Sequence, residues 1–155
     1  LIRPGHMTMK DTKIICTPIK TTILSIMSGK ISLQSLSPGG LAALKLDINP
    51  HFTKSDRLVG NIICTEDDKD FIIKYELNLN ITFLDKKYNL EIDNTVTIQI
   101  GPMNIIGTII KVKKMKRKEK IYKIQLSKPF CVKKGTKIYF TTNTDHIEII
   151  GFAII

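Results

Sequence analysis

Tryptophan is absent from the 155-residue sequence, and cysteine occurs only at Cys16, Cys64 and Cys131. The cysteines lie far apart, without a Cys-x-x-Cys pair or a histidine at ligand spacing, so the sequence predicts neither a zinc site nor a disulfide framework. We interpret the three cysteines as buried free thiols. The three histidines are equally scattered, which leaves an enzyme with a cysteine or histidine at its centre only as a remote alternative.

Long apolar runs are absent as well. No run approaches the roughly 18 residues that cross a membrane, and the first residues lack the apolar core of a secretory leader, so we expect a cytoplasmic protein with no membrane partner. The phosphate-binding pattern G-x-x-x-x-G-K-[ST] is missing too. We therefore expect no cofactor in this sequence and no GTP hydrolysis by it.

Arginine is scarce although the chain is basic. Lysine and arginine number 24 against 14 acidic residues, for a net charge of +10, and only Arg3, Arg57 and Arg117 are arginine. A strongly basic surface attracts nucleic-acid phosphates and releases their counterions. The abundance of lysine, isoleucine and asparagine is also typical of an AT-rich genome, so the total charge alone leaves both explanations open.

Short apolar runs rich in β-branched residues and separated by turn residues predict an all-β protein. No segment shows a capped helical stripe. Many short strands with Gly and Pro turns are typical of a sandwich or closed barrel, and closure removes exposed strand edges. The expected strands are Ile14–Ile19, Thr22–Met27, Leu41–Leu46, Leu58–Cys64, Phe71–Phe83, Thr95–Ile100, Ile105–Val112, Ile121–Leu126, Lys137–Thr141 and Ile147–Ile154.

A charged segment, Thr65–Asp70, divides the sequence into two predicted parts, residues 1–66 and 67–155. Its acidic residues lack the glycine-bearing spacing of a calcium loop, so we interpret the segment as a solvated connection.

The densest basic segment is Lys111–Lys120, which falls between two expected strands and predicts a charged hairpin. Lysine acts as a point charge and suits sequence-independent contact with phosphates. The alternative is a solubilising loop that blunts a strand edge. The candidate RNA or ribosome contacts are Lys113, Lys114, Lys116, Arg117, Lys118 and Lys120.

One block of the sequence comprises Ser37-Pro38-Gly39-Gly40-Leu41, Leu46-Asp47, Asn49-Pro50 and the run Thr53–Gly60. In order and spacing this block resembles the gamma subunit of translation initiation factor 2. Similar features continue outward at Ile2–Gly5, Cys16–Ile19, Ile100-Gly101, Leu126–Cys131, Lys134-Gly135 and Ile149–Ile154. The resemblance therefore spans nearly the whole chain.

That resemblance implies elongation-factor-Tu-like β-barrels, one partial (the end of domain II) and one complete (domain III). In the family a GTP-binding domain, which carries GTP and magnesium, precedes these barrels. The implied partners are initiator methionyl-tRNA, the alpha and beta subunits of the factor, and the small ribosomal subunit. The residues implied to face the tRNA end or the alpha subunit are Ser28, Gly29, Lys30, Pro38, Gly39 and Gly40.

Two departures from the family pattern point to a divergent eukaryotic lineage. Ala42–Lys45 stands where the family has a further Gly-Thr, and Thr141–His146 replaces an arginine-rich segment. The leading alternative is another translational GTPase of the same plan, such as the selenocysteine-specific elongation factor. The Thr53–Gly60 run and Leu46-Asp47 disfavour it.

Overall fold

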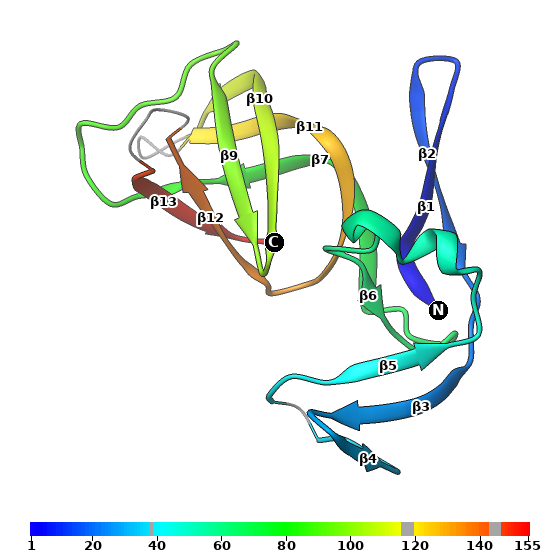
Figure 1. Cartoon of the computed structure of the whole chain (residues 1–155). Helices are drawn as coiled ribbons and strands as arrows, with labels where there is room; N and C mark the ends of the chain where they lie inside the picture. The colour runs from blue at the N-terminus through cyan, green and yellow to red at the C-terminus, as the bar shows by residue number, and fades with distance from the viewer. Residues whose placement is uncertain (38, 116–119, 143–146) are drawn as a thin grey trace.

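The computed structural model describes residues 1–37, 39–115, 120–142 and 147–155, and three parts are visible in it (Figure 1). A barrel lies at the upper left, a two-stranded ribbon rises at the right, and a small sheet lies below. In the described residues the only helices are two single turns of 3-10 helix, so the all-β prediction is confirmed. No helix among them is long and apolar enough to cross a membrane.

The N-terminal part consists of two open three-stranded sheets. In the first, β1 (Ile2–Lys10) pairs antiparallel with β2 (Lys13–Ile19), and β6 (Ile62–Ile63) pairs with the start of β1. The second has the order β4-β3-β5. Its strands are β3 (Ile23–Ser28), β4 (Ile31–Leu33) and β5 (Ala43–Leu46).

Local sequence explains the turns of this part. Asp11 and Thr12 both have positive φ, 47° and 68°, which suits the two-residue turn of the β1–β2 hairpin. The helical turns η1 (Pro50–Phe52) and η2 (Lys54–Asp56) follow β5. Asn49 caps the first by accepting the backbone N–H of His51 at 2.9 Å, and proline occupies the first helical position.

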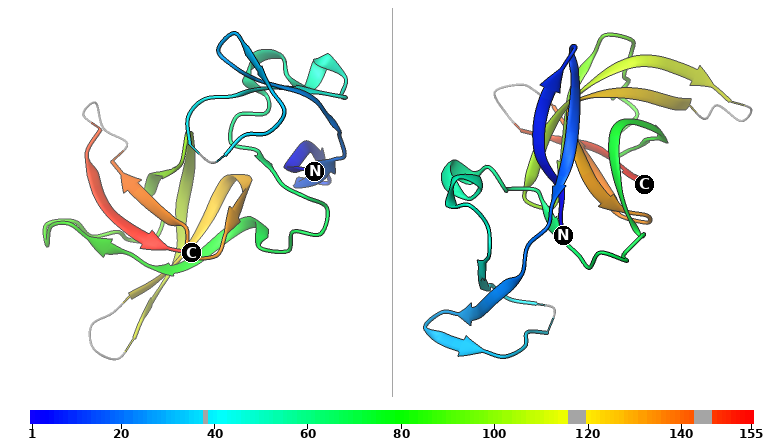
Figure 2. Two further views of the ribbon diagram at one scale, coloured as in Figure 1. Left: turned by 90° about the horizontal axis from the view of Figure 1, so that it is seen from below. Right: turned by 90° about the vertical axis from the view of Figure 1, so that its right-hand side faces the viewer.

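The C-terminal part is a seven-stranded sheet that closes on itself (Figure 2, left). Its strand order is β7-β11-β10-β9-β12-β13-β8. The two end members belong to one run of chain, Phe71–Phe83, that is interrupted only at Ile81, so the order begins and ends on the same run and forms a barrel. The strands are β7 (Phe71–Asn80), β8 (Thr82–Phe83), β9 (Thr95–Ile100), β10 (Met103–Lys114), β11 (Lys120–Lys133), β12 (Lys137–Thr141) and β13 (Ile149–Ile154).

The hydrophobic core lies inside this barrel. Along β9, and along β10 from Met103 to Ile109, every second residue points inward and is buried, as strand geometry requires. Before Phe71, by contrast, Ile2 and Pro4 are the described apolar side chains that are buried, and Leu24, Ile31 and Leu41 are largely exposed. The open sheets with little core of their own agree with the predicted partial barrel.

Several predicted strands differ in extent from the observed ones. Only Ile62–Ile63 of the expected strand Leu58–Cys64 is extended, and β1 is far longer than the strand end expected at Ile2–Gly5. Strand β11 continues through Pro129, where a register shift in its pairing with β7 accommodates a residue without an N–H group. The prediction of three buried thiols is also wrong in part, because only Cys131 is buried and the other two are partly exposed.

The two parts are joined through Arg3 on β1. Its guanidinium donates to the carbonyl oxygens of Asp68 at 2.8 Å, and of Glu66 and Phe71 at 3.4 Å each. Backbone carbonyls at the charged connection between the parts therefore converge on the Arg3 side chain. The chain start also pairs with the end of the N-terminal part, since the Cys64 N–H donates to the Leu1 carbonyl at 2.9 Å.

Candidate subunit and nucleic-acid interfaces

The structure brings together two segments that were predicted to share a face. The turn at Gly29-Lys30 joins β3 to β4, and the loop containing Gly39 and Gly40 joins β4 to β5. Because β4 and β5 both run antiparallel to β3, the Gly29-Lys30 turn and the end of the glycine loop, which leads into Ala43, both lie beside the C-terminal end of β3. The Ser28 hydroxyl links them by donating to the Leu41 carbonyl at 3.3 Å.

This hairpin–glycine face, defined by Ser28, Gly29, Lys30, Gly39 and Gly40, is open to solvent. The three glycines have φ of 60°, 114° and 81°, and a Cβ at any of them would meet nothing within 4 Å. Glycine is therefore favoured at these positions by the positive φ that the turns require, and not by a neighbouring atom that would exclude a side chain. The glycines leave backbone accessible to a partner, and Lys30 adds an exposed positive charge. Pro38 lies outside the described residues.

The basic segment begins on paired strands. Strands β10 and β11 pair to Lys114↔Lys120, and together they form a ribbon that projects from the barrel (Figure 2, right). We call the described lysines Lys111, Lys113, Lys114, Lys120 and Lys123 the basic ribbon. The remaining predicted contacts, Lys116, Arg117 and Lys118, lie outside the described residues.

Two pairs of like charges face each other across the basic ribbon. Lys111 is the register partner of Lys123, and Lys114 is the register partner of Lys120. Like charges directly opposite each other destabilise a sheet. One pair is partly relieved because Lys123 forms an ion pair with Glu76 at 2.9 Å. No described acidic residue pairs with Lys111, Lys113 or Lys114, so their charge is available to an anionic partner.

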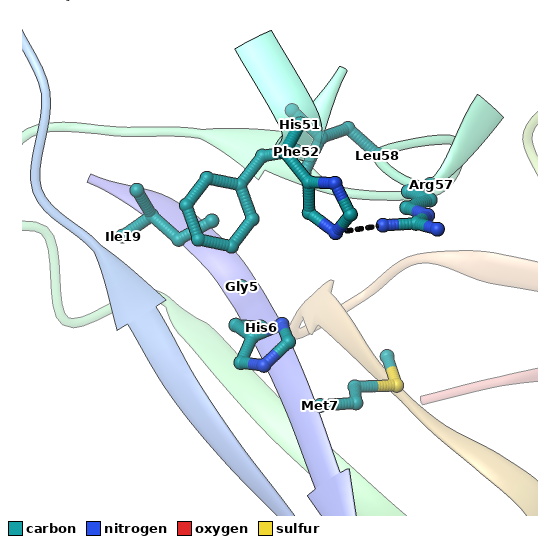
Figure 3. Close-up of a pocket in the computed structure, with 8 residues that line it drawn as sticks. All are labelled: Gly5, His6, Met7, Ile19, His51, Phe52, Arg57 and Leu58. Atoms are coloured by element: carbon teal, nitrogen blue, oxygen red, sulfur yellow. Dashed lines mark hydrogen bonds between the residues drawn. The ribbon is translucent and has the colours of Figure 1, made fainter. Parts of the chain in front are cut away.

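An open cavity of about 310 Å³ lies between β1 and the helical turns (Figure 3). The side chains of His6 and His51 flank Phe52, with ring centroids 5.5 and 6.4 Å from it in edge-to-face geometry. Arg57 contacts the Nε2 atom of His51. Sequence reasoning used Thr53–Gly60 only for its resemblance and did not predict this cavity, because its histidines are far apart along the chain.

The two histidines are the titratable groups of the cavity besides Arg57. Its lining has no cysteine, serine or carboxylate, and no group of three potential metal ligands occurs in the part of the chain that the structure describes. Cys131 lies elsewhere, and burial raises the pKa of its thiol. A thiol with a raised pKa is a poor nucleophile. The geometry thus gives no support to a thiol-dependent enzyme.

Solved structures of translation factors share this fold. The elongation factor SelB from Methanococcus maripaludis, in its apo form, superposes with a TM-score of 0.68 over 87% of the chain and 34% of that protein, at 17% identity. A second structure of that factor, with a GTP analogue bound to it, gives the same TM-score. At this identity the likeness defines the class of fold, the β-barrels of translational GTPases, and no more.

Sequence comparison gives the family. The family described as "Initiation factor eIF2 gamma, C terminal" matches residues 71–155, more than half of the chain, and the chain belongs to it. Eukaryotic translation initiation factor 2 subunit 3 of Drosophila melanogaster is 29% identical over 97% of the chain. The gamma subunits of Schizosaccharomyces pombe and Archaeoglobus fulgidus are 28% and 24% identical over 98% and 99% of it. These findings confirm the predicted resemblance over the selenocysteine-factor alternative.

The chain spans about a third of the length of these relatives, 34% of the Drosophila protein and 37% of the Archaeoglobus protein. Its similarity to them extends through the N-terminal sheets as well as the barrel, because nearly the whole chain is aligned.

Proposed function

We propose that the chain is a binding scaffold in translation initiation: the end of domain II, residues 1–66, followed by domain III, residues 67–155, of an initiation factor 2 gamma subunit. In this role it helps to hold initiator methionyl-tRNA, engages the alpha subunit through the hairpin–glycine face, and faces the small ribosomal subunit. The beta subunit completes the complex, which acts in the cytoplasm. The observation that carries the proposal is the family match to residues 71–155, extended to the whole chain by the aligned relatives.

A scaffold role, and not a catalytic one, is proposed because the sequence lacks the phosphate-binding pattern. The chain has no phosphate-binding loop, so GTP and magnesium belong to a GTP-binding domain outside this sequence, and GTP hydrolysis is an activity of the whole factor. Calorimetry of the chain with GTP and magnesium should accordingly show no binding.

The convergence at the end of β3 supports a partner surface there. The Ser28–Leu41 hydrogen bond holds two turns side by side, and both expose glycine backbone. A second chain can approach such backbone closely because no Cβ intervenes.

Binding to the purified alpha subunit tests the proposal, because the selenocysteine-factor alternative predicts no such interaction. The chain should bind the alpha subunit in calorimetry, and Lys30→Glu should weaken binding about tenfold, since it places a repulsive charge at the interface. Lys10→Glu is the matched control, an exposed lysine at the tip of the β1–β2 hairpin that should leave affinity unchanged. Absence of any heat with the alpha subunit would overturn the assignment.

A further inference from the structure

A pocket of about 300 Å³ opens at the end of the barrel from which the basic ribbon projects. It is lined by Asn80, Ile81, Phe83, Tyr88, Asn89, Lys120 and Tyr122. A neighbouring cavity of about 490 Å³ shares Asn89 and Lys120 with it and adds Lys114, so the two cavities lie side by side next to the ribbon. The first volume lies at the lower end of the range for pockets that take small ligands.

The connection between β8 and β9, which supplies Tyr88 and Asn89, is fixed in place. Leu90 is buried in the barrel core. Farther along, the Asp93 N–H donates to the Ile109 carbonyl at 2.8 Å, and the Ile109 N–H donates to the Asn94 carbonyl at 2.9 Å. The pocket wall is thus built on the barrel and not on a free loop.

The lining combines flat aromatic rings with amides. Phe83 and Tyr122 pack edge to face with centroids 6.1 Å apart. Asn80 and Asn89 are exposed at the pocket, and the side-chain amide of Asn80 offers both donors and an acceptor. The Tyr88 hydroxyl is buried and makes no well-aligned hydrogen bond to a described residue, although the nearby Glu148 carboxylate raises the pKa of Tyr88.

Positive charge stands at the rim. Lys120 donates from Nζ to Asn89 Oδ1 at 2.8 Å, which places its ammonium at the pocket mouth. Its register partner Lys114 carries a second ammonium. The nearby acids are engaged: Glu91 Oε1 accepts from Asn89 Nδ2 at 3.3 Å, and Glu148 pairs with Lys87 at 3.4 Å.

We propose that this pocket binds one unstacked nucleotide of a single-stranded or looped RNA. Lys114 and Lys120 hold the phosphates, the base packs against Tyr88 in the pocket wall, and the amide of Asn80 meets its edge. Proteins that recognise RNA bases mostly take them from loops and single strands, by stacking and by hydrogen bonds to the base edge. The inference rests on the proposed RNA role of the basic ribbon and deepens it by naming the RNA class.

The test compares a short single-stranded RNA with a duplex of the same sequence by fluorescence anisotropy. Charge alone favours the duplex, which carries more phosphates per unit length. A preference for the single strand therefore reports base contact. Tyr88→Leu and, separately, Asn80→Ala should weaken single-strand binding, about fivefold or more for loss of stacking, and leave duplex binding unchanged.

Tyr139→Leu and Asn104→Ala are the matched controls. Tyr139 is an exposed tyrosine that lies near a lysine, as Tyr88 does, and Asn104 is an exposed asparagine near the start of β10, far along that strand from Lys114. Both should retain wild-type binding to both RNAs. If the wild type favours the duplex and neither pocket variant changes binding, the pocket proposal fails while the RNA role of the ribbon stands. If the wild type binds neither RNA, both fail, and the alpha-subunit experiment still decides the rest of the proposed function.

Discussion

At the residue scale, Gly5 marks a place where the β1–β2 ribbon leaves no room for a side chain. Its φ is +85°, and a Cβ built there would collide with the backbone carbonyl of Thr17 on β2. Gly5 also donates its N–H to Asn61 Oδ1 at 2.8 Å, so the ribbon and the segment after the helical turns are fixed at the same residue.

We expect Gly5→Ala to destabilise the chain by about 2 kcal/mol or more, because the strained backbone and the collision add. Gly135→Ala is the matched control: its φ of +88° is nearly the same, but nothing lies within 4 Å of its Cβ position. That variant should lose only about 1 kcal/mol. Urea unfolding of both variants measures the difference, and equal losses would show that the close approach to Thr17 does not matter.

The Glu76–Lys123 pair gives a pH dependence. The pKa of Glu76 is lowered, first by its hydrogen bond with Lys123 and also by the positive charge. A carboxylate whose pKa is lower in the folded than in the unfolded state stabilises the fold above the unfolded pKa, and that stability is lost as the pH falls through the folded pKa. Glu76→Gln should therefore flatten the fall in the free energy of unfolding below about pH 4.5, the ordinary pKa of the group.

The effect of this exposed pair is expected to be small and to weaken with salt. Lys123→Gln should remove the same part of the acid dependence, and the double variant should behave as either single variant does. An unchanged acid limb in Glu76→Gln would contradict the prediction.

At the element scale, the sequence predicted strands best where apolar residues alternate inside one barrel. The predicted strands Thr95–Ile100 and Lys137–Thr141 match β9 and β12 at both ends. Prediction failed where long-range pairing overrides local preference. Strand β1 continues through Pro4 and Gly5 at a register shift, because β2 and β6 pair with the residues on either side of them. Strand β11 likewise passes through Pro129 at a register shift.

The candidate sites show the same contrast between features that local sequence predicts and features that depend on long-range contacts. The convergence of the Gly29 turn with the glycine loop, and the pairing of lysines along β10 and β11, came from short-range patterns or from the family resemblance. The pocket at Tyr88 and the cavity at His51 join residues far apart in the sequence, and no spacing rule finds them. Only the closed topology places Asn80, Asn89 and Lys120 around one hollow.

The basic segment Lys111–Lys120 carries a prediction of its own. Replacing Lys113, Lys114, Lys116, Arg117, Lys118 and Lys120 with serine should weaken binding to RNA or to the small ribosomal subunit. The slope of log affinity against log salt should fall by somewhat under one unit for each phosphate that the variant no longer neutralises. Thermal stability should barely change, because Lys113 and Lys114 are exposed and exposed lysines contribute little to folding.

Three lysines outside the ribbon provide its control. Serine at Lys10, Lys13 and Lys45 removes positive charge from exposed positions of the N-terminal sheets, so the salt slope should move less per residue replaced. Wild-type affinity and slope in the six-site variant would leave the segment as a solvated hairpin that protects a strand edge.

At the scale of the whole molecule, the hydrophobic core lies in the barrel, and the N-terminal sheets contact the barrel but have little core of their own. Between them Gly60 lies against the side chain of Met103, and Arg3 donates hydrogen bonds to the backbone carbonyls of Glu66, Asp68 and Phe71. Planar guanidinium groups can donate to several acceptors at once, whereas an ammonium is a single point charge. The joint therefore depends on the shape of this side chain as well as on its charge.

Arg3→Lys should loosen this joint although it conserves the charge. We expect faster amide hydrogen exchange at the base of the N-terminal part, at the Cys64 N–H that donates to Leu1, and unchanged exchange in the barrel strands β9 and β10. Lys20→Ala is the matched control, since it breaks the ion pair of 2.9 Å with Glu66 on the same connection, where both side chains are more than half exposed. Such a pair contributes little, so its loss should leave exchange at Cys64 unchanged. Equal exchange at Cys64 in Arg3→Lys and the wild type would show that the joint does not depend on the shape of the Arg3 guanidinium.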